Sequence, residues 1–150
     1  GPGAAPRTGE YYETPDGFYM SKFIFRGEWD NDQVLMRSSE MYLIEAEAEA
    51  RLGNETAAKQ ALLAIQQRAG VTTEVSANSG EALIQEILLE RRKELFGEGH
   101  RIYDIQRTKQ TLARTSENHW SKVTLTAGDK KLYYPIPQAE IDANPNIVPN

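Results

Sequence analysis

The sequence contains no cysteine. This absence excludes disulfides, thiol nucleophiles and cysteine-ligated metal sites. No apolar run approaches the roughly 20 residues that cross a bilayer, and no signal peptide opens the sequence. Basic residues are the minority, since 17 Lys and Arg face 22 Asp and Glu and the net charge is −5. Because a nucleic-acid site needs a basic surface to neutralise phosphates, double-stranded nucleic acid is not an expected partner.

Motifs that carry enzyme chemistry are also scarce. His100 and His119 are the only histidines and fall on different predicted elements, so no metal site is expected. Residues 97–99, Gly-Glu-Gly, begin like a dinucleotide fingerprint but follow a predicted helix, whereas the fingerprint needs a preceding strand. The many carboxylates fall mostly on outer helix faces. An acid–base hydrolase is therefore the least favoured function, and we predict neither catalysis nor a cofactor.

Residues 33–113 show helical periodicity. Apolar or small residues recur every three or four positions in three stretches: Leu35, Tyr42, Leu43, Ala46 and Ala50, then Ala58, Ala61, Leu62, Ile65 and Ala69, then Ile84, Ile87, Leu88 and Leu95. Gly53 suits the end of the first helix and Asn54 the start of the second, which predicts an antiparallel hairpin. Helical spacing resumes from Arg101 to about Leu112. The segment therefore predicts two consecutive helical hairpins.

Residues 1–32 are rich in aromatic residues, show no helical face and read mostly as loop. Tyr11, Tyr12 and Trp29 lie in this segment, and Trp120 lies in a polar loop after the helices. Exposed aromatic rings can stack on the C–H faces of sugars, and these four are the candidate substrate-binding residues. The same side chains could instead pack over the helices, and both interpretations stay open.

Residues 114–150 predict a small β-hairpin and a tail. Residues 123–126 and 131–134 alternate in polarity and flank Gly128, which favours two paired strands. Four prolines then predict an extended tail with at most one helical turn, at residues 138–143. The expected fold class is mainly α.

Arg91 occupies a position on the apolar stripe of the third helix. A buried arginine needs an acidic partner, because an unpaired buried charge costs several kcal/mol. Asp104, on the next predicted helix, is a candidate. We therefore predict a structural ion network that includes Arg91 and Asp104.

The helical segments together resemble the carboxy-terminal region of the SusD/RagB family. Residues 35–48 are similar to the family's LR-x-x-E-x-Y-L-x-x-A-E-A helix, and residues 65–70 stand in place of its I-R-x-R-A-G. Residues 90–107 are similar to E-R-R-x-E-L-x-x-E-G-x-R-x-x-D-L-x-R, and residues 134–145 match its closing I-P-x-x-E-I-x-x-N-P. The ordered set is more specific than any one motif. The end departs from the family, which usually finishes near Q-N-P-G-Y.

This resemblance implies tetratricopeptide-like helical hairpins and a function without catalysis. Family members are glycan- or nutrient-binding lipoproteins on the outer membrane surface of Bacteroidetes, where they cap a SusC-like TonB-dependent transporter. The membrane is reached only through a lipid anchor at an amino-terminal cysteine, so residues 1–150 are expected to be a carboxy-terminal fragment. The matched motifs contain no sugar-contacting residue of the family. The four aromatic residues therefore stay candidates by chemistry alone.

A second hypothesis assigns the helices to protein recognition. Surfaces of helical hairpins often bind other proteins. On this reading the chain is a helical-repeat module that docks the transporter and does not itself contact the ligand.

Overall fold

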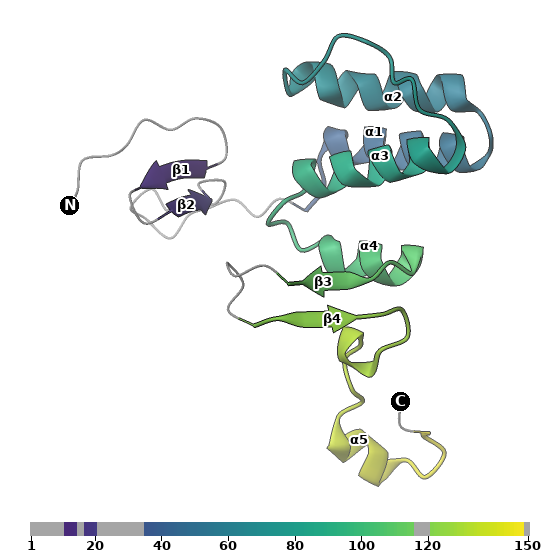
Figure 1. Ribbon diagram of the computed structural model, residues 1–150. Helices are drawn as coiled ribbons and strands as arrows, with labels where there is room; N and C mark the ends of the chain where they lie inside the picture. The colour runs from purple at the N-terminus through teal and green to yellow at the C-terminus, as the bar shows by residue number, and fades with distance from the viewer. Residues whose placement is uncertain (1–10, 15–16, 21–34, 116–120, 149–150) are drawn as a thin grey trace. The chain divides into compact units, whose positions relative to one another are not determined.

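The computed structural model describes residues 11–14, 17–20, 35–115 and 121–148 (Figure 1). The chain divides into two compact units, Gly1–Glu98 and Gly99–Asn150, which are described separately. The first unit contains β1 (Tyr11–Thr14), β2 (Gly17–Met20), α1 (Ser38–Arg51), α2 (Glu55–Arg68) and α3 (Gly80–Glu94). The second contains α4 (Arg101–Thr108), β3 (Leu112–Arg114), β4 (Val123–Leu125), the 3₁₀ helix η1 (Lys130–Leu132) and α5 (Gln138–Ala143). The fold class is therefore mainly α, as predicted.

β1 and β2 form an antiparallel pair in which Tyr12 lies opposite Tyr19. The prediction that this segment is mostly loop is wrong for these eight residues. The signal was present in the sequence, because Pro15-Asp16-Gly17 between two stretches rich in aromatic residues is typical of a tight turn.

α1 and α2 form the predicted antiparallel hairpin. Gly53 ends α1 in the left-handed backbone region, with φ of 85°, and the Asn54 N–H donates to the Glu49 carbonyl (2.9 Å). This bond and the Gly53 N–H to Ala50 carbonyl bond (3.2 Å) satisfy the last carbonyls of α1. Asn54 takes the N-cap position of α2, but its side chain donates to Glu49 Oε2 (2.7 Å) and makes no cap bond.

The core of the first unit is shared by α1, α2 and α3, which lie side by side in Figure 1. Its members are small residues of the first two helices and larger aliphatic residues: Leu43, Ala46, Ala50, Ala58, Ala61, Leu62, Ile65, Leu83, Ile84, Ile87 and Leu88. The alanines allow close approach of α1 and α2, because helix separation depends on side-chain size at the contact. Among the described residues, no helix combines the length and apolar character needed to cross a membrane.

α2 and α3 run in the same direction, because hydrogen bonds join both their amino-terminal ends and, through Arg68 and Glu94, their carboxy-terminal ends. The Gly80 N–H donates to Glu55 Oε1 (2.7 Å). This bond and a hydrogen bond to Ser79 lower the pKa of Glu55. In a regular array of hairpins with short turns, α3 would run antiparallel to α2. The α1–α2 hairpin is present, but the tetratricopeptide-like character of the helices is not confirmed.

In the second unit, α4 ends earlier than the periodicity predicts. Lys109 adopts the left-handed region (φ 54°), and the Gln110 N–H donates to the Ile105 carbonyl (3.1 Å). Leu112 consequently begins β3 and packs against the cluster of Ile105, Leu125 and Leu132. The predicted helix end at Leu112 is wrong by four residues, since α4 ends at Thr108. Leu112 fitted the helical spacing because it packs against the same apolar cluster as Ile105, but it does so from a strand.

The predicted pairing of residues 123–126 with 131–134 is also wrong. β4 pairs antiparallel with β3, with Leu112 opposite Leu125. Lys130–Leu132 form η1, because the Asp129 carboxylate accepts the Lys131 N–H (2.9 Å). The alternating pattern indicated that Leu132 is buried, and η1 does bury it beside Leu125. No strand is needed at this position for that burial. The predicted helical turn at residues 138–143 is confirmed as α5.

Glu86 of α3 fixes the loop that returns the chain from the end of α2. Its carboxylate accepts hydrogen bonds from Ser76, from Asn78 Nδ2 (2.9 Å) and from Gln66 Nε2 (3.2 Å). Partial burial acts to raise the pKa of Glu86, but these hydrogen bonds outweigh it and the pKa lies below the usual value. The ionised form therefore stabilises the folded loop.

We predict that Glu86→Gln lowers the free energy of unfolding by about 1 kcal/mol at pH 7, since the carboxylate is partly exposed. A lowered pKa in the folded state gives stability that is present above the unfolded pKa of about 4.3 and lost as pH falls through the folded value. The gap between wild type and variant should close below about pH 4, measured by urea unfolding at several pH values. A gap that is independent of pH would contradict this role.

Candidate functional site

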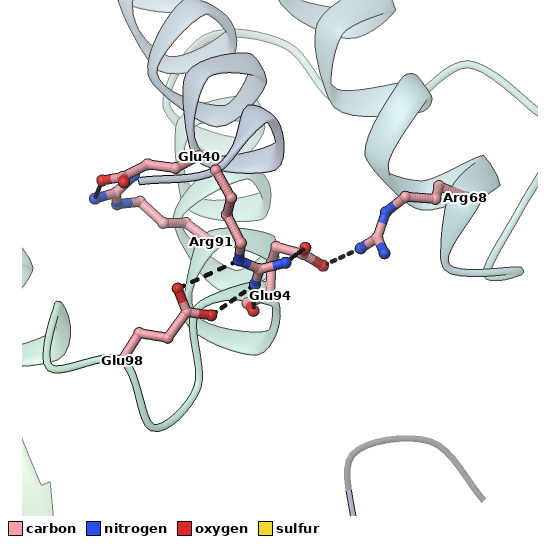
Figure 2. A network of polar contacts seen from close by, with 6 residues as sticks. Glu40, Arg68, Arg91, Glu94 and Glu98 are labelled. Carbon is pink, nitrogen blue, oxygen red and sulfur yellow. Dashed lines mark hydrogen bonds and ion pairs between the residues drawn. The ribbon is translucent and has the colours of Figure 1, made fainter. Parts of the chain in front are cut away.

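A cluster of charged side chains joins α1, α2 and α3 at one end of the first unit (Figure 2). Arg37, just before α1, lies between two carboxylates of the α3 end. Its Nη1 donates to Glu94 Oε1 (2.6 Å), its Nη2 donates to Glu98 Oε1 (2.7 Å) and its Nε donates to Glu98 Oε2 (3.2 Å). The fork geometry of a guanidinium suits this two-point contact with Glu98.

Glu94 also binds a second arginine. Arg68, at the end of α2, donates to Glu94 Oε2, while Arg37 Nη2 donates to the Glu94 carbonyl. In Figure 2 Arg68 approaches Glu94 from the helix that carries it, on the side away from Glu98. Burial acts to lower the pKa of Arg37, but the hydrogen bonds and attraction of Glu98 and Glu94 outweigh it and raise the pKa. The guanidinium therefore stays charged throughout the physiological range.

Arg91 forms a separate buried ion pair. Its Nη2 donates to Glu40 Oε1 (3.0 Å), and the two residues are only 7% and 8% exposed. This contact links the first turn of α1 to the last turn of α3. The buried position of Arg91 on α3 is as predicted. Glu40 was not predicted as its partner, because the sequence places it 51 positions away on another helix.

The predicted contact between Arg91 and Asp104 joins residues of the two units and stays a prediction. Within the second unit, Asp104 is 7% exposed and its Oδ1 accepts a hydrogen bond from Arg107 Nε (2.8 Å). Asp104 and Arg107 are one turn apart on α4, so this pair stabilises a single helix.

The interpretation of the acidic residues as mainly solvated is wrong for four glutamates. Glu40, Glu47, Glu90 and Glu94 are each less than a tenth exposed. Arg51 Nε donates to Glu47 Oε1 (2.9 Å), and Lys93 Nζ donates to Glu90 Oε2 (3.2 Å). Periodicity alone does not find such residues, because a glutamate beside a cation packs where an apolar side chain is expected. These ion pairs have a structural role, because they hold the helices of the first unit in position.

The four candidate aromatic residues are only partly placed. Tyr11 and Tyr12 are the first two residues of β1, and the structure describes their backbone alone. Trp29 and Trp120 lie outside the described residues. All four assignments to ligand binding stay predictions.

Two exposed tyrosines of the second unit were not singled out as binding candidates from sequence. Tyr134 is 89% exposed after η1, and Tyr103 is 63% exposed on α4. Tyr134 was missed because its alternating surroundings indicated a strand. Over the ranges that the structure describes, no group of three or more histidine or acidic side chains has the arrangement of a metal site.

Comparisons with known proteins identify the fold. The model of the SusD family matches residues 3–150. A solved SusD-like carbohydrate-binding protein from Bacteroides vulgatus is 33% identical, with a TM-score of 0.74, over 87% of this chain and 33% of that one. A second, a SusD superfamily protein from the same species, is 28% identical with a TM-score of 0.76, over 94% of this chain and 34% of that one. No curated protein matches closely enough to count as a relative.

The helical unit and the family match over residues 3–150 thus define a SusD-type helical protein, and the chain belongs to the SusD family. It spans about a third of the length of the solved relatives named above.

Two adjacent arginines of α3 provide a matched test of the buried pair. We predict that Arg91→Ala lowers the free energy of unfolding by about 3–5 kcal/mol, because it leaves Glu40 buried without this cation. Arg92→Ala removes an exposed arginine from the same helix and should change the free energy of unfolding by at most about 0.5 kcal/mol. Thermal and urea unfolding measure both variants. Equal effects of the two substitutions would sink the assignment.

The fork of Arg37 can be tested by keeping its charge. We predict that Arg37→Lys costs about 1–2 kcal/mol, because an ammonium group does not reproduce the paired contacts with Glu98 and Glu94. Arg114→Lys, at an exposed position of β3, is the control and should be neutral. Urea unfolding reports both free energies, and an Arg37→Lys variant as stable as wild type would contradict the role of the fork.

Proposed function

We propose that this chain is part of the non-catalytic glycan- or nutrient-binding component of a TonB-dependent outer-membrane uptake complex. The observation that carries the proposal is the SusD family match over nearly the whole chain, together with a 33%-identical solved relative that is a SusD-like carbohydrate-binding protein. In this role the protein is held at the cell surface by a lipid anchor and works beside a SusC-like transporter.

The described contacts support a scaffold role for the first unit. Glu40 and Glu94, two buried carboxylates at the ends of the helices, are held by arginines of other segments. A glycoside hydrolase needs a pair of carboxylates that face substrate across a cleft. These two instead hold helices together, which favours a binding protein whose ligand groups lie elsewhere.

Aromatic side chains are the groups that this chain offers to a sugar. A tyrosine or tryptophan ring presents a flat apolar face to the C–H face of a pyranose, and the tyrosine hydroxyl hydrogen-bonds to sugar hydroxyls. We propose Tyr11, Tyr12, Trp29 and Trp120 for this role, with exposed Tyr134 as an additional candidate. The carboxy-terminal position of residues 1–150 in a longer chain is part of the same proposal.

A titration of the full-length protein with an oligosaccharide panel tests this function. We predict that removal of a stacking ring by Trp29→Ala, Tyr12→Ala or Tyr134→Ala weakens binding of the recognised glycan by about 5- to 10-fold per contacting residue. Tyr12→Phe is the matched control, since it keeps the ring and removes only the hydroxyl. Isothermal titration calorimetry measures the dissociation constants.

Wild-type affinity in all three alanine variants would remove the assignments of Trp29, Tyr12 and Tyr134. If the full-length protein binds no glycan in the panel yet co-purifies with the transporter, the second hypothesis, a helical module that docks the transporter, replaces the first.

A further inference from the structure

The junction between α4 and η1, in the second unit, is held by two contacts. The Gln106 side chain of α4 donates from Nε2 to the Leu132 carbonyl of η1. Ile105 and Leu132, the neighbours of these groups, pack in the same apolar cluster. The last turn of α4 and η1 are therefore fixed to each other, and the side chains around them start from a fixed backbone.

Three lysines lie at this junction with exposed side chains. Lys109 ends α4, and Lys130 and Lys131 are the first two residues of η1. Within the described part of the chain, no carboxylate pairs with the ammonium group of any of the three. The acidic residues that lie near them in the sequence have other contacts, since Asp104 accepts a hydrogen bond from Arg107 and Asp129 accepts the Lys131 N–H.

Two tyrosines accompany the lysines. Tyr133 directly follows η1 and is 45% exposed, and Tyr103 of α4 is 63% exposed. Tyr103 lies one turn before Gln106, so the Cβ atoms of these two residues are about 5–6 Å apart. Gln106 in turn contacts the carbonyl of the peptide that joins Leu132 to Tyr133. The two tyrosines are thus carried to the junction by its two elements.

The charge of this part of the chain favours an anionic ligand. Residues 99–150 contain seven Lys and Arg against five Asp and Glu, whereas residues 1–98 contain ten against seventeen. A dense polyanion such as nucleic acid is still not expected, because the whole chain carries −5. A sugar with a carboxylate fits better, since its C–H face can stack on a tyrosine and its carboxylate accepts charge-assisted hydrogen bonds from lysine.

We propose that the α4–η1 junction is a contact site for the uronic acid residues of an acidic glycan. Tyr103 and Tyr133 bind the sugar ring, and Lys109, Lys130 and Lys131 bind its carboxylate. This inference rests on the proposed function and adds the chemical class of the ligand. Each exposed ion pair is weak, so the three lysines together give a preference for acidic over neutral sugars and only modest affinity.

Paired glycans test this preference in the full-length protein. The probes are oligomers of galacturonate, glucuronate and mannuronate, each with its methyl ester, which keeps the sugar ring and removes the charge. By calorimetry at low salt, we expect at least one acid to bind about tenfold more tightly than its ester. Added NaCl should reduce this ratio, because salt screens exposed charges. Equal affinity for acid and ester in all three pairs would overturn the inference.

Lysine variants locate the preference. Lys130→Gln and Lys131→Gln should each lower the ratio of acid to ester affinity by about two- to fivefold. Lys122→Gln is the matched control, since it removes the same charge from an exposed position just before β4 and should leave the ratio unchanged. Tyr133→Ala should weaken binding of acid and ester alike. Equal effects of all three lysine variants would indicate general charge attraction and would overturn the site.

Lysine acetylation of the wild-type protein gives the same answer without any variant that has to fold. We expect the preferred acid to slow acetylation of Lys130 and Lys131 at least about threefold at saturation and to leave Lys122 unchanged, as measured by mass spectrometry. Equal slowing by inorganic sulfate would reduce the junction to a general anion site and overturn the inference.

The two proposals fail in different ways. Binding of neutral glycans with no preference for acids overturns this inference and leaves the proposed function standing. Absence of any glycan binding removes both.

Discussion

The first unit depends on the ion pairs that gather one end of each helix. Apolar packing is non-directional, and an alanine-rich contact between α1 and α2 would tolerate sliding. The contacts of Glu94 with Arg37 and Arg68 do not tolerate it, because each buried charge that loses its partner carries a large desolvation cost. We infer that these pairs set the register of the three helices, while the apolar core supplies most of the stabilisation.

The same pairs explain why the chain needs a long return loop. They place the start of α1 beside the ends of α2 and α3, so α3 must run in the direction of α2. The chain therefore travels back along the unit between Arg68 and Gly80, and Glu86 and Glu55 fix the returning segment at its polar groups. A repeat array would join α2 to α3 by a short turn. Here a longer loop joins them, and it is held by carboxylates that accept hydrogen bonds from backbone and side-chain donors.

Local sequence patterns predicted much of this fold. They did not predict which residues far apart in the sequence form contacts. The α1–α2 hairpin follows from periodicity and from Gly53, and the burial of Arg91 follows from its place on the α3 stripe. The choice of Glu40 as partner depends on how α1 and α3 align, which no local signal encodes. The β-strand error has a different, local origin. Leu132 needs burial, but the Asp129 carboxylate accepts the Lys131 N–H and thereby sets a 3₁₀ turn in place of a strand.

The glutamates of α1 lie on more than one side of the helix. Glu40 and Glu47 are buried on the inner side, where Glu40 accepts a hydrogen bond from Arg91 and Glu47 accepts one from Arg51. Glu45, by contrast, is exposed. A buried carboxylate without a cation carries a large desolvation cost. The positions of the arginines, and not the acidic residues alone, therefore decide which glutamates of α1 can face the core.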